Sequence, residues 1–215
     1  MHDCSDTMET EIRCFQHCSR DWNILCFTIP DVCPLCGHDT MTTEMRIPPY
    51  LIQSPLTDAN TTQCCVVIKP TIGCFLTDYT NQSNLHIAVA NTAGVVYEFD
   101  ERGVTVGGSD WTQCLRVNVL GILSETVYKK CDETLAIMAQ NETWTKEKYN
   151  EFSHNCYDFV MQFLRNISNV VKTGCLDSRS LFCEQVIVPV TSKAGKYISM
   201  YRTVATDGYI IQRVT

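Results

Sequence analysis

Charged residues are scarce in this chain of 215 residues: Asp, Glu, Lys and Arg make up 19% of it, against 45% hydrophobic residues. This balance excludes an intrinsically disordered chain, which combines low hydrophobicity with high charge. The basic residues are scattered and the net charge is -7. The sequence therefore has no stripe of Lys and Arg that could bind along the phosphates of a nucleic acid, and we expect no nucleic-acid partner.

Long apolar runs are also missing. No stretch of eighteen apolar residues occurs, and residues 1–11 lack the basic and then apolar pattern of a secretory signal. We therefore expect no transmembrane segment and a cytoplasmic or nuclear location. Thiols stay reduced in those compartments, so the fourteen cysteines are expected to be metal ligands, a nucleophile or small core residues.

The chain divides by composition into a cysteine-rich element, residues 1–45, and a larger domain, residues 46–215. Residues 11–40 hold five cysteines and two histidines. The prolines that follow, Pro48, Pro49 and Pro55, mark an irregular entry into the larger domain.

Hydrophobic periodicity predicts an α+β class for the larger domain. Short runs rich in β-branched and aromatic residues predict strands, and apolar residues recurring every three or four positions predict helices. We expect an antiparallel sheet packed on helices, with a hairpin turn at residues 91–94. The pattern after residue 174 is weaker: 181–190 favours a strand, and 192–204 suits either a helix or a strand. The strands are expected at 65–69, 74–79, 85–89, 95–99, 111–120 and 208–214, and the helices at 125–140 and 155–169.

Two short cysteine spacings point to a structural zinc site. Cys14 and Cys18 are separated by three residues, and Cys33 and Cys36 by two. Each spacing turns two thiolates to one side of a tight turn, and two such pairs converge on a tetrahedral Zn²⁺. Gly37 suits the positive φ that such a turn needs. Four cysteine ligands leave no position for water, so the zinc is expected to be structural.

Other interpretations of this cluster remain open. His17, Cys26 and His38 are alternative ligands, since they lie within the same segment. The cysteines are otherwise reduced thiols of the surface or core, or Cys33 and Cys36 are a redox pair. A redox pair prefers a helix N-terminus beside a βαβ unit, a pattern that is absent around residue 33.

A second cysteine, Cys156, is placed for nucleophilic chemistry. It opens the helix expected from residue 155, where unpaired backbone N–H groups and the helix dipole favour a thiolate. His86 lies on an expected strand, and Glu98 on the next one. A hairpin turning at residues 93–94 places the side chains of 86 and 98 on the same face of two neighbouring strands. Glu98 can then orient His86 while His86 takes the proton of Cys156. The alternative is a buried structural thiol beside a strand histidine.

The order of these residues resembles the circularly permuted papain-like superfamily, which includes lecithin:retinol acyltransferase-like, NlpC/P60-like and PPPDE enzymes. Leu85-His86-Ile-Ala-Val89 is similar to the histidine strand of the acyltransferase-like branch, and Asn155-Cys156-Tyr-Asp-Phe159 to its helix start. Glu98 replaces that branch's second histidine. The resemblance implies Cys156 as the nucleophile, His86 as the base and Glu98 as the orienting group.

The whole chain is also similar to the makorin opposite-strand protein family of vertebrates. His17-Cys18 and Cys33-Pro-Leu-Cys36 carry that resemblance. It implies a cysteine-rich front end joined to a domain of this kind, and no established activity.

Two functions follow from these observations. The first is a cysteine-dependent hydrolase or acyltransferase with a structural zinc element. Its substrate is a peptide or isopeptide, an amide, or a thioester or lipid ester; the sequence does not choose among them, and the expected lack of a membrane anchor slightly favours a protein or peptide. The second is a catalytically silent interaction module of the same fold. The reactivity of Cys156 toward iodoacetamide distinguishes the two, because an isolated thiol has a pKa near about 8.5.

Overall fold

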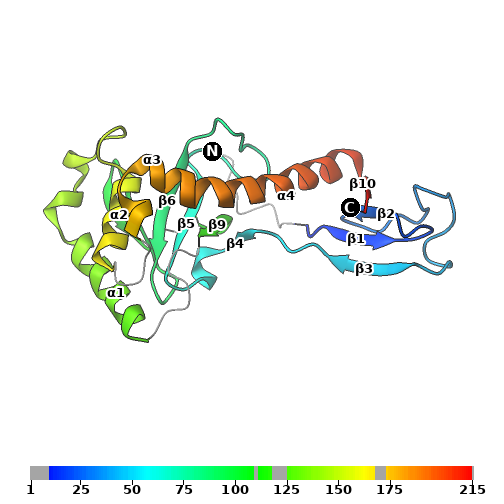
Figure 1. Ribbon diagram of the computed structural model, residues 1–215, viewed down its shortest axis with the longest axis horizontal. Coiled ribbons are helices and arrows are strands. Elements are labelled where there is room, and N and C mark those ends of the chain that lie inside the picture. Colours follow the sequence, from blue (N-terminus) through cyan, green and yellow to red (C-terminus); the bar gives the residue numbers. More distant parts are fainter. Residues whose placement is uncertain (1–9, 109–110, 118–124, 168–172, 215) are drawn as a thin grey trace. The chain divides into compact units, whose positions relative to one another are not determined.

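The computed structural model describes residues 10–108, 111–117, 125–167 and 173–214 (Figure 1). The chain forms two compact units, a larger one that contains Pro55–Ala194 and a smaller one made of Asp6–Ser54 and Gly195–Thr215. Sequence analysis placed one boundary, after residue 45. The smaller unit of the structure is instead discontinuous in sequence, because its sheet includes strands from both segments.

The larger unit is built on a six-stranded sheet, and each of its pairings is antiparallel. The expected hairpin at 91–94 is present, with Gly94 at φ 77°. A Cβ atom at Gly94 would lie 2.4 Å from the backbone oxygen of Asn60, so this turn requires glycine. In sheet order the strands are β4 (Leu56–Thr57), β9 (Cys114–Val117), β5 (Cys65–Pro70), β6 (Leu85–Ala90), β7 (Val96–Asp100) and β8 (Gly103–Val106).

Helix α2 packs on β6, β7 and α1 (Figure 1). Its buried stripe contains Phe159, Val160, Phe163 and Leu164, which matches the expected amphipathic pattern. Each such side chain that is fully buried stabilises the fold by about 1.5–3 kcal/mol. Helices packed on an antiparallel sheet confirm the expected α+β class. The helices of this unit include α1 (Glu125–Ala139), α2 (Cys156–Asn166) and α3 (Arg179–Phe182), with 3-10 turns η2 (Ala59–Thr61), η3 (Glu142–Trp144), η4 (Lys146–Lys148) and η5 (Thr173–Leu176).

Two expected strands are wrong. Residues 74–79 form a turn in which the Asp78 carboxylate accepts the backbone N–H of Cys74. Residues 181–190 are helical: they run from α3 through the π-helical turn η6 (Cys183–Ile187) into α4 (Val188–Asp207). A short apolar run alone does not separate strand from buried helix. Part of the expected strand 111–120 lies outside the described residues.

The smaller unit contains a four-stranded antiparallel sheet in the order β10, β2, β1, β3. The expected final strand is confirmed as β10, which pairs with β2. Phe15, Ile24, Cys26 and Cys33 form the buried core of this unit. The strands are β1 (Arg13–Gln16), β2 (Trp22–Cys26), β3 (Ile47–Leu51) and β10 (Tyr209–Arg213).

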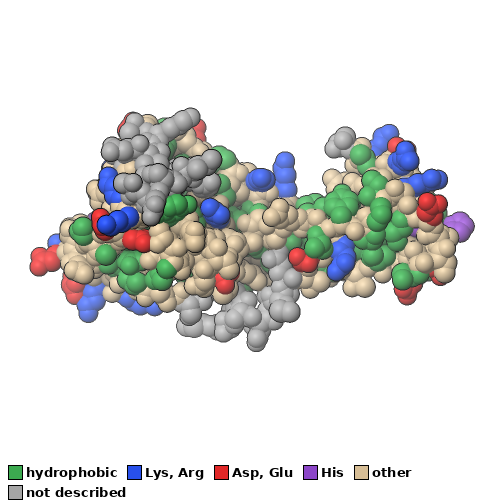
Figure 2. All heavy atoms as spheres, turned by 90° about the horizontal axis from the view of Figure 1, so that it is seen from below, with side chains coloured by type: hydrophobic (Ala, Val, Ile, Leu, Met, Phe, Trp, Pro, Cys, Tyr) green, Lys and Arg blue, Asp and Glu red, His purple; other side chains and the backbone are tan. Residues whose placement is uncertain are grey.

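Hydrophobic side chains also lie on the surface of the smaller unit (Figure 2). Its exposed large hydrophobic residues include Trp22, Ile47, Tyr50, Leu51 and Tyr209. Within the described residues, no helix is both long and apolar enough to cross a bilayer. The expectation of reduced thiols fails at Cys74, which is disulfide-bonded, whereas the other described cysteines are thiols outside any disulfide.

Candidate functional site

His86 is the second residue of β6 and lies directly opposite Lys69 of β5. The imidazole ring centroid lies 5.7 Å from that of Trp111, a side chain that is almost fully buried. The Lys69 Nζ lies 4.6 Å from the Trp111 ring centroid. Trp111 therefore fixes both cationic side chains on one face of the sheet, through packing and a cation–π contact.

Glu98 of β7 holds one nitrogen of the His86 ring. Its Oε2 lies 3.1 Å from His86 Nε2, and Glu98 is 5% exposed. A Cβ atom at Gly108 would lie 2.7 Å from the other carboxylate oxygen, Oε1. Gly108 therefore leaves the space that the carboxylate occupies, a role that sequence analysis missed because it depends on contacts distant in the chain.

Cys156 is the first residue of α2, and the helix start is firmly capped. The Asn155 side chain accepts the backbone N–H of Tyr157 at 3.0 Å, and the Asp158 carboxylate accepts the backbone N–H of Asn155 at 2.9 Å. Arg179 Nη2 in turn donates to Asp158 Oδ2 at a distance of 2.7 Å. This reciprocal capping box fixes where the thiol leaves the helix.

The three side chains that sequence analysis selected meet at one place. His86, Glu98 and Cys156 line one cleft, and His86 Nε2 lies 3.1 Å from Glu98 Oε2. Burial lowers the pKa of His86, but hydrogen bonding to Cys156 and Glu98, together with the charges of these two groups, outweighs burial and raises the pKa to about 9. A cysteine paired with such a histidine, itself held by an acceptor, is the arrangement that activates a thiol.

A cleft of about 870 Å³ opens at this cluster. His86, Glu98 and Cys156 line it, together with Tyr149 and Glu101. The Cys156 side chain is 6% exposed, so it contributes to the floor of the cleft. The space suffices for a peptide-sized or other small substrate.

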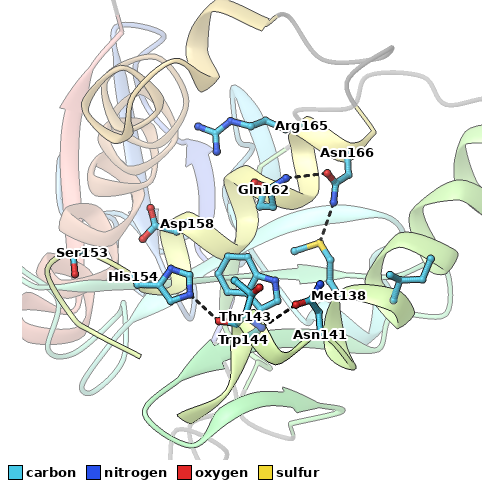
Figure 3. A pocket seen from close by; sticks show the side chains of 11 residues that line it. Met138, Asn141, Thr143, Trp144, Ser153, His154, Asp158, Gln162, Arg165 and Asn166 are labelled. Atoms are coloured by element: carbon cyan, nitrogen blue, oxygen red, sulfur yellow. Dashed lines mark hydrogen bonds between the residues drawn. The ribbon is translucent and has the colours of Figure 1, made fainter. Parts of the chain in front are cut away.

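His154, which precedes the helix, belongs to a different pocket, of about 420 Å³ (Figure 3). Its ring stacks on Trp144 with centroids 4.7 Å apart, and its Nε2 is bonded to the backbone oxygen of Thr143 at 2.9 Å. These contacts occupy the imidazole. His154 therefore lies in a pocket separate from the one that Cys156 lines.

The smaller unit gathers a second cluster, in which His17, Cys18, Cys33 and Cys36 each offer one ligand atom. These atoms lie within 4.8 Å of one another. The residues therefore have the ligand types and spacing that suit a metal ion. The turn after Cys33 has the expected knuckle form, with Gly37 at φ 73°.

His17 presents Nδ1 to this cluster. Nδ1 lies 3.4 Å from Cys36 Sγ, and Nε2 lies 2.6 Å from Thr43 Oγ1. The Thr43 hydroxyl donates to the backbone oxygen of Asp39, so it accepts from Nε2–H. Nδ1 then carries the lone pair that a metal requires. Sequence analysis missed Thr43 because no local pattern marks such an outer contact.

Cys14 lies apart from that group. Cys14 is a buried residue of β1 and lies opposite Leu25 of β2 and Tyr50 of β3. Cys26, another cysteine of the same sheet, has a pKa that burial raises to about 11. A backbone hydrogen bond at His38 helps lower the pKa of Cys36 to about 6. Of the alternative ligands, the structure brings His17 into the group with Cys18, Cys33 and Cys36.

Comparison with known proteins gives matches along most of the chain. Residues 49–204 match the family described as DUF4796 C-terminal, and residues 11–39 match DUF4796 N-terminal. The chain is 29% identical over 211 residues to MKRN2 opposite strand protein of Homo sapiens, an alignment that covers 98% of this chain and 92% of that protein. The resemblance to the makorin opposite-strand family is thereby confirmed.

Proposed function

We propose that this chain, a member of the DUF4796 family, is a thiol hydrolase or acyltransferase in which Cys156 is the nucleophile. The proposal is drawn from the side chains described above. The observation that carries this proposal is that the Cys156 thiol lines the same cleft as the His86 imidazole, which the Glu98 carboxylate holds at 3.1 Å. The sequence resemblance of the histidine strand and the helix start to papain-like enzymes, which the family comparisons do not show, suggests the same chemistry.

The reaction we propose is acyl transfer through a thioester. His86 takes the proton of Cys156, whose sulfur attacks the carbonyl carbon of the substrate. His86 then gives that proton to the leaving amine or alkoxide as the bond to it breaks, and a thioester remains. A water or acceptor hydroxyl attacks the thioester, gives its proton to His86 and releases the thiolate, which recovers that proton. Backbone N–H groups at the start of α2 stabilise the oxyanion.

The test is the rate at which iodoacetamide alkylates Cys156, followed by peptide mapping. At about pH 6 an isolated thiol is largely protonated. We expect Cys156 to react at least about tenfold faster than in His86→Ala, and Glu98→Gln to fall between the two. The Cys156→Ser variant assigns the modified position.

A catalytically silent interaction module is the second candidate. The exposed aromatic and aliphatic side chains of the smaller unit favour it, because such groups mark binding surfaces when they are contiguous. Alkylation of Cys156 that is as slow as in His86→Ala would support this module and overturn the enzyme.

We also propose that the cysteine–histidine cluster holds a structural Zn²⁺ through His17, Cys18, Cys33 and Cys36. Three thiolates and one imidazole fill a tetrahedral shell and leave no position for water. Zinc would crosslink β1 to the turn at Gly37 and so stabilise the smaller unit. We expect about one zinc per chain by metal analysis. We also propose that the protein lies in the cytoplasm or nucleus and acts on a protein or peptide, not on nucleic acid.

A further inference from the structure

The cleft at Cys156 has more carboxylates than cations. Glu98, Asp100, Glu101 and Glu151 line it, whereas Lys69 and Arg102 are its lysine and arginine. The distribution of these charges around the nucleophile therefore restricts which substrates the cleft accepts. The inference drawn from it rests on the proposed function.

The strand order separates the charges on the sheet. Lys69 lies on β5, His86 on β6, and Glu98 and Asp100 on β7, in adjacent positions across the sheet. Glu101 follows in the turn from β7 to β8. Lys69 thus lies on one side of His86, and Glu98 and Asp100 lie on the other.

Two of the four carboxylates already have cationic partners. Asp100 lies 2.6 Å from Arg102, and Glu98 holds His86. Glu101 and Glu151 are exposed and form no ion pair with any described residue. These two carboxylates are therefore available to a ligand.

An aromatic side chain, Tyr149, lines the same cleft as the two available carboxylates. Burial raises the pKa of the Tyr149 phenol, and the charges of Cys156, Glu101 and Glu151 raise it further, because all three lie near it. Phe152 adds a second aromatic to the lining and is 81% exposed. Carboxylates beside an aromatic face are a combination that binds ammonium and guanidinium groups.

We propose that the substrate of Cys156 is peptide-like and carries a cationic side chain next to the scissile carbonyl, held by Glu101 and Glu151 against Tyr149. A long fatty acyl chain fits less well. Besides Tyr149 and Phe152, only Leu85 and Tyr157 among the lining residues offer an extended apolar surface.

The experiment compares two chloromethyl ketones on the full chain, acetyl-lysyl and acetyl-norleucyl, which differ by the ammonium group. Both alkylate the Cys156 sulfur with loss of chloride. We expect the lysyl reagent to react at least about fivefold faster, since two ion pairs contribute, and the difference to shrink in about 0.5 M salt.

The matched variants are double substitutions of exposed glutamates. Glu101→Gln with Glu151→Gln should bring the ratio of the two rates close to one. Glu133→Gln with Glu142→Gln, which removes two exposed carboxylates outside the cleft, should leave the ratio unchanged. Thermal unfolding of each variant checks that it is folded.

The outcomes separate this inference from the proposed function. Equal lysyl and norleucyl rates, or a faster norleucyl reagent, on a Cys156 that iodoacetamide labels rapidly would overturn the substrate class alone. Labelling of Cys156 by all reagents no faster than in His86→Ala would overturn the enzyme itself.

Discussion

At the scale of single residues, Gly108 decides where the Glu98 carboxylate lies. A Cβ atom there would approach Glu98 Oε1 to 2.7 Å, and the end of a flexible side chain is what must move. Alanine at this position should therefore displace the carboxylate from His86 at little cost to the fold.

We predict that Gly108→Ala slows iodoacetamide labelling of Cys156 at about pH 6 by at least about threefold, while the free energy of unfolding changes by less than about 1 kcal/mol. Gly174→Ala is the control, because its Cβ would meet nothing within 4 Å. An unchanged labelling rate in Gly108→Ala would show that Glu98 does not orient the imidazole.

The raised pKa of His86 predicts how stability depends on pH. The pKa is about 9 in the folded chain, against an ordinary value of 6.5 for histidine. The imidazolium therefore contributes stability that is fully present below about pH 6.5 and is lost as pH rises through about 9.

Urea denaturation at about pH 6 and about pH 10 measures this contribution. We expect wild type to lose a few kcal/mol relative to His86→Gln between the two, because a tenfold change in proton affinity on folding corresponds to about 1.4 kcal/mol. Parallel stability curves for the two proteins would contradict a raised pKa at His86.

The residues found from the sequence alone are those that local rules mark. Cys156 is identified by its place at a helix start, and His86 and Glu98 by parity around a hairpin. Trp111 and Gly108 were not found, because their roles arise from packing between segments that are distant in the chain. No periodicity records such contacts.

At the scale of elements, the start of α2 is the rigid support of the thiol. Asn155 caps the helix and is itself 9% exposed, and its amide nitrogen also donates to the backbone oxygen of Glu151. The cap therefore joins the helix to the segment that carries Tyr149 and Glu151.

We predict that Asn155→Ala lowers the free energy of unfolding by about 1 kcal/mol, and up to about 2, in urea denaturation. Asn155→Asp should recover much of that loss, because aspartate also caps. Asn141→Ala removes the exposed cap of η3 and is the comparison. Equal, small effects at both positions would contradict a supporting role for this cap.

The turn that carries the cysteine–histidine cluster gives a second prediction at this scale. Thr43 orients His17 through Nε2, so Thr43→Val should weaken zinc binding about 10- to 100-fold, measured by competition with a chromophoric chelator. Thr43→Ser keeps the hydroxyl and should bind zinc like wild type. Loss of binding in both variants would point to packing and not to the hydrogen bond.

Strand and helix prediction succeeded where the pattern had a clear period and failed where it had none. The stripe of α2 spans several turns and was recognised. Residues 181–190 contain apolar side chains without a clear period, and there tertiary packing selects a helix that sequence alone did not reveal.

At the scale of the whole molecule, the chain comprises two units, and their chemistry is separate. Cys156, His86 and Glu98 belong to residues 55–194, whereas His17, Cys18, Cys33 and Cys36 belong to the smaller unit. Removal of metal should therefore affect one unit and leave the other intact.

We predict that 1,10-phenanthroline lowers the thermal stability of the smaller unit, followed by the fluorescence of Trp22 in a variant without the other tryptophans. The labelling rate of Cys156, measured in the chain with all its tryptophans, should stay the same. If the unfolding temperature of zinc-containing protein is the same with and without the chelator, the metal is not structural, since structural sites contribute directly to folding.

The pairing of β10 with β2 has a consequence for biosynthesis. The ribosome makes β2 first, then all of residues 55–194, and only afterwards β10. Until β10 arrives, the backbone amides of β2 on that side stay unpaired and are open to another chain. If the cluster of His17, Cys18, Cys33 and Cys36 holds zinc as proposed, the metal would hold this segment together while β10 is still being translated.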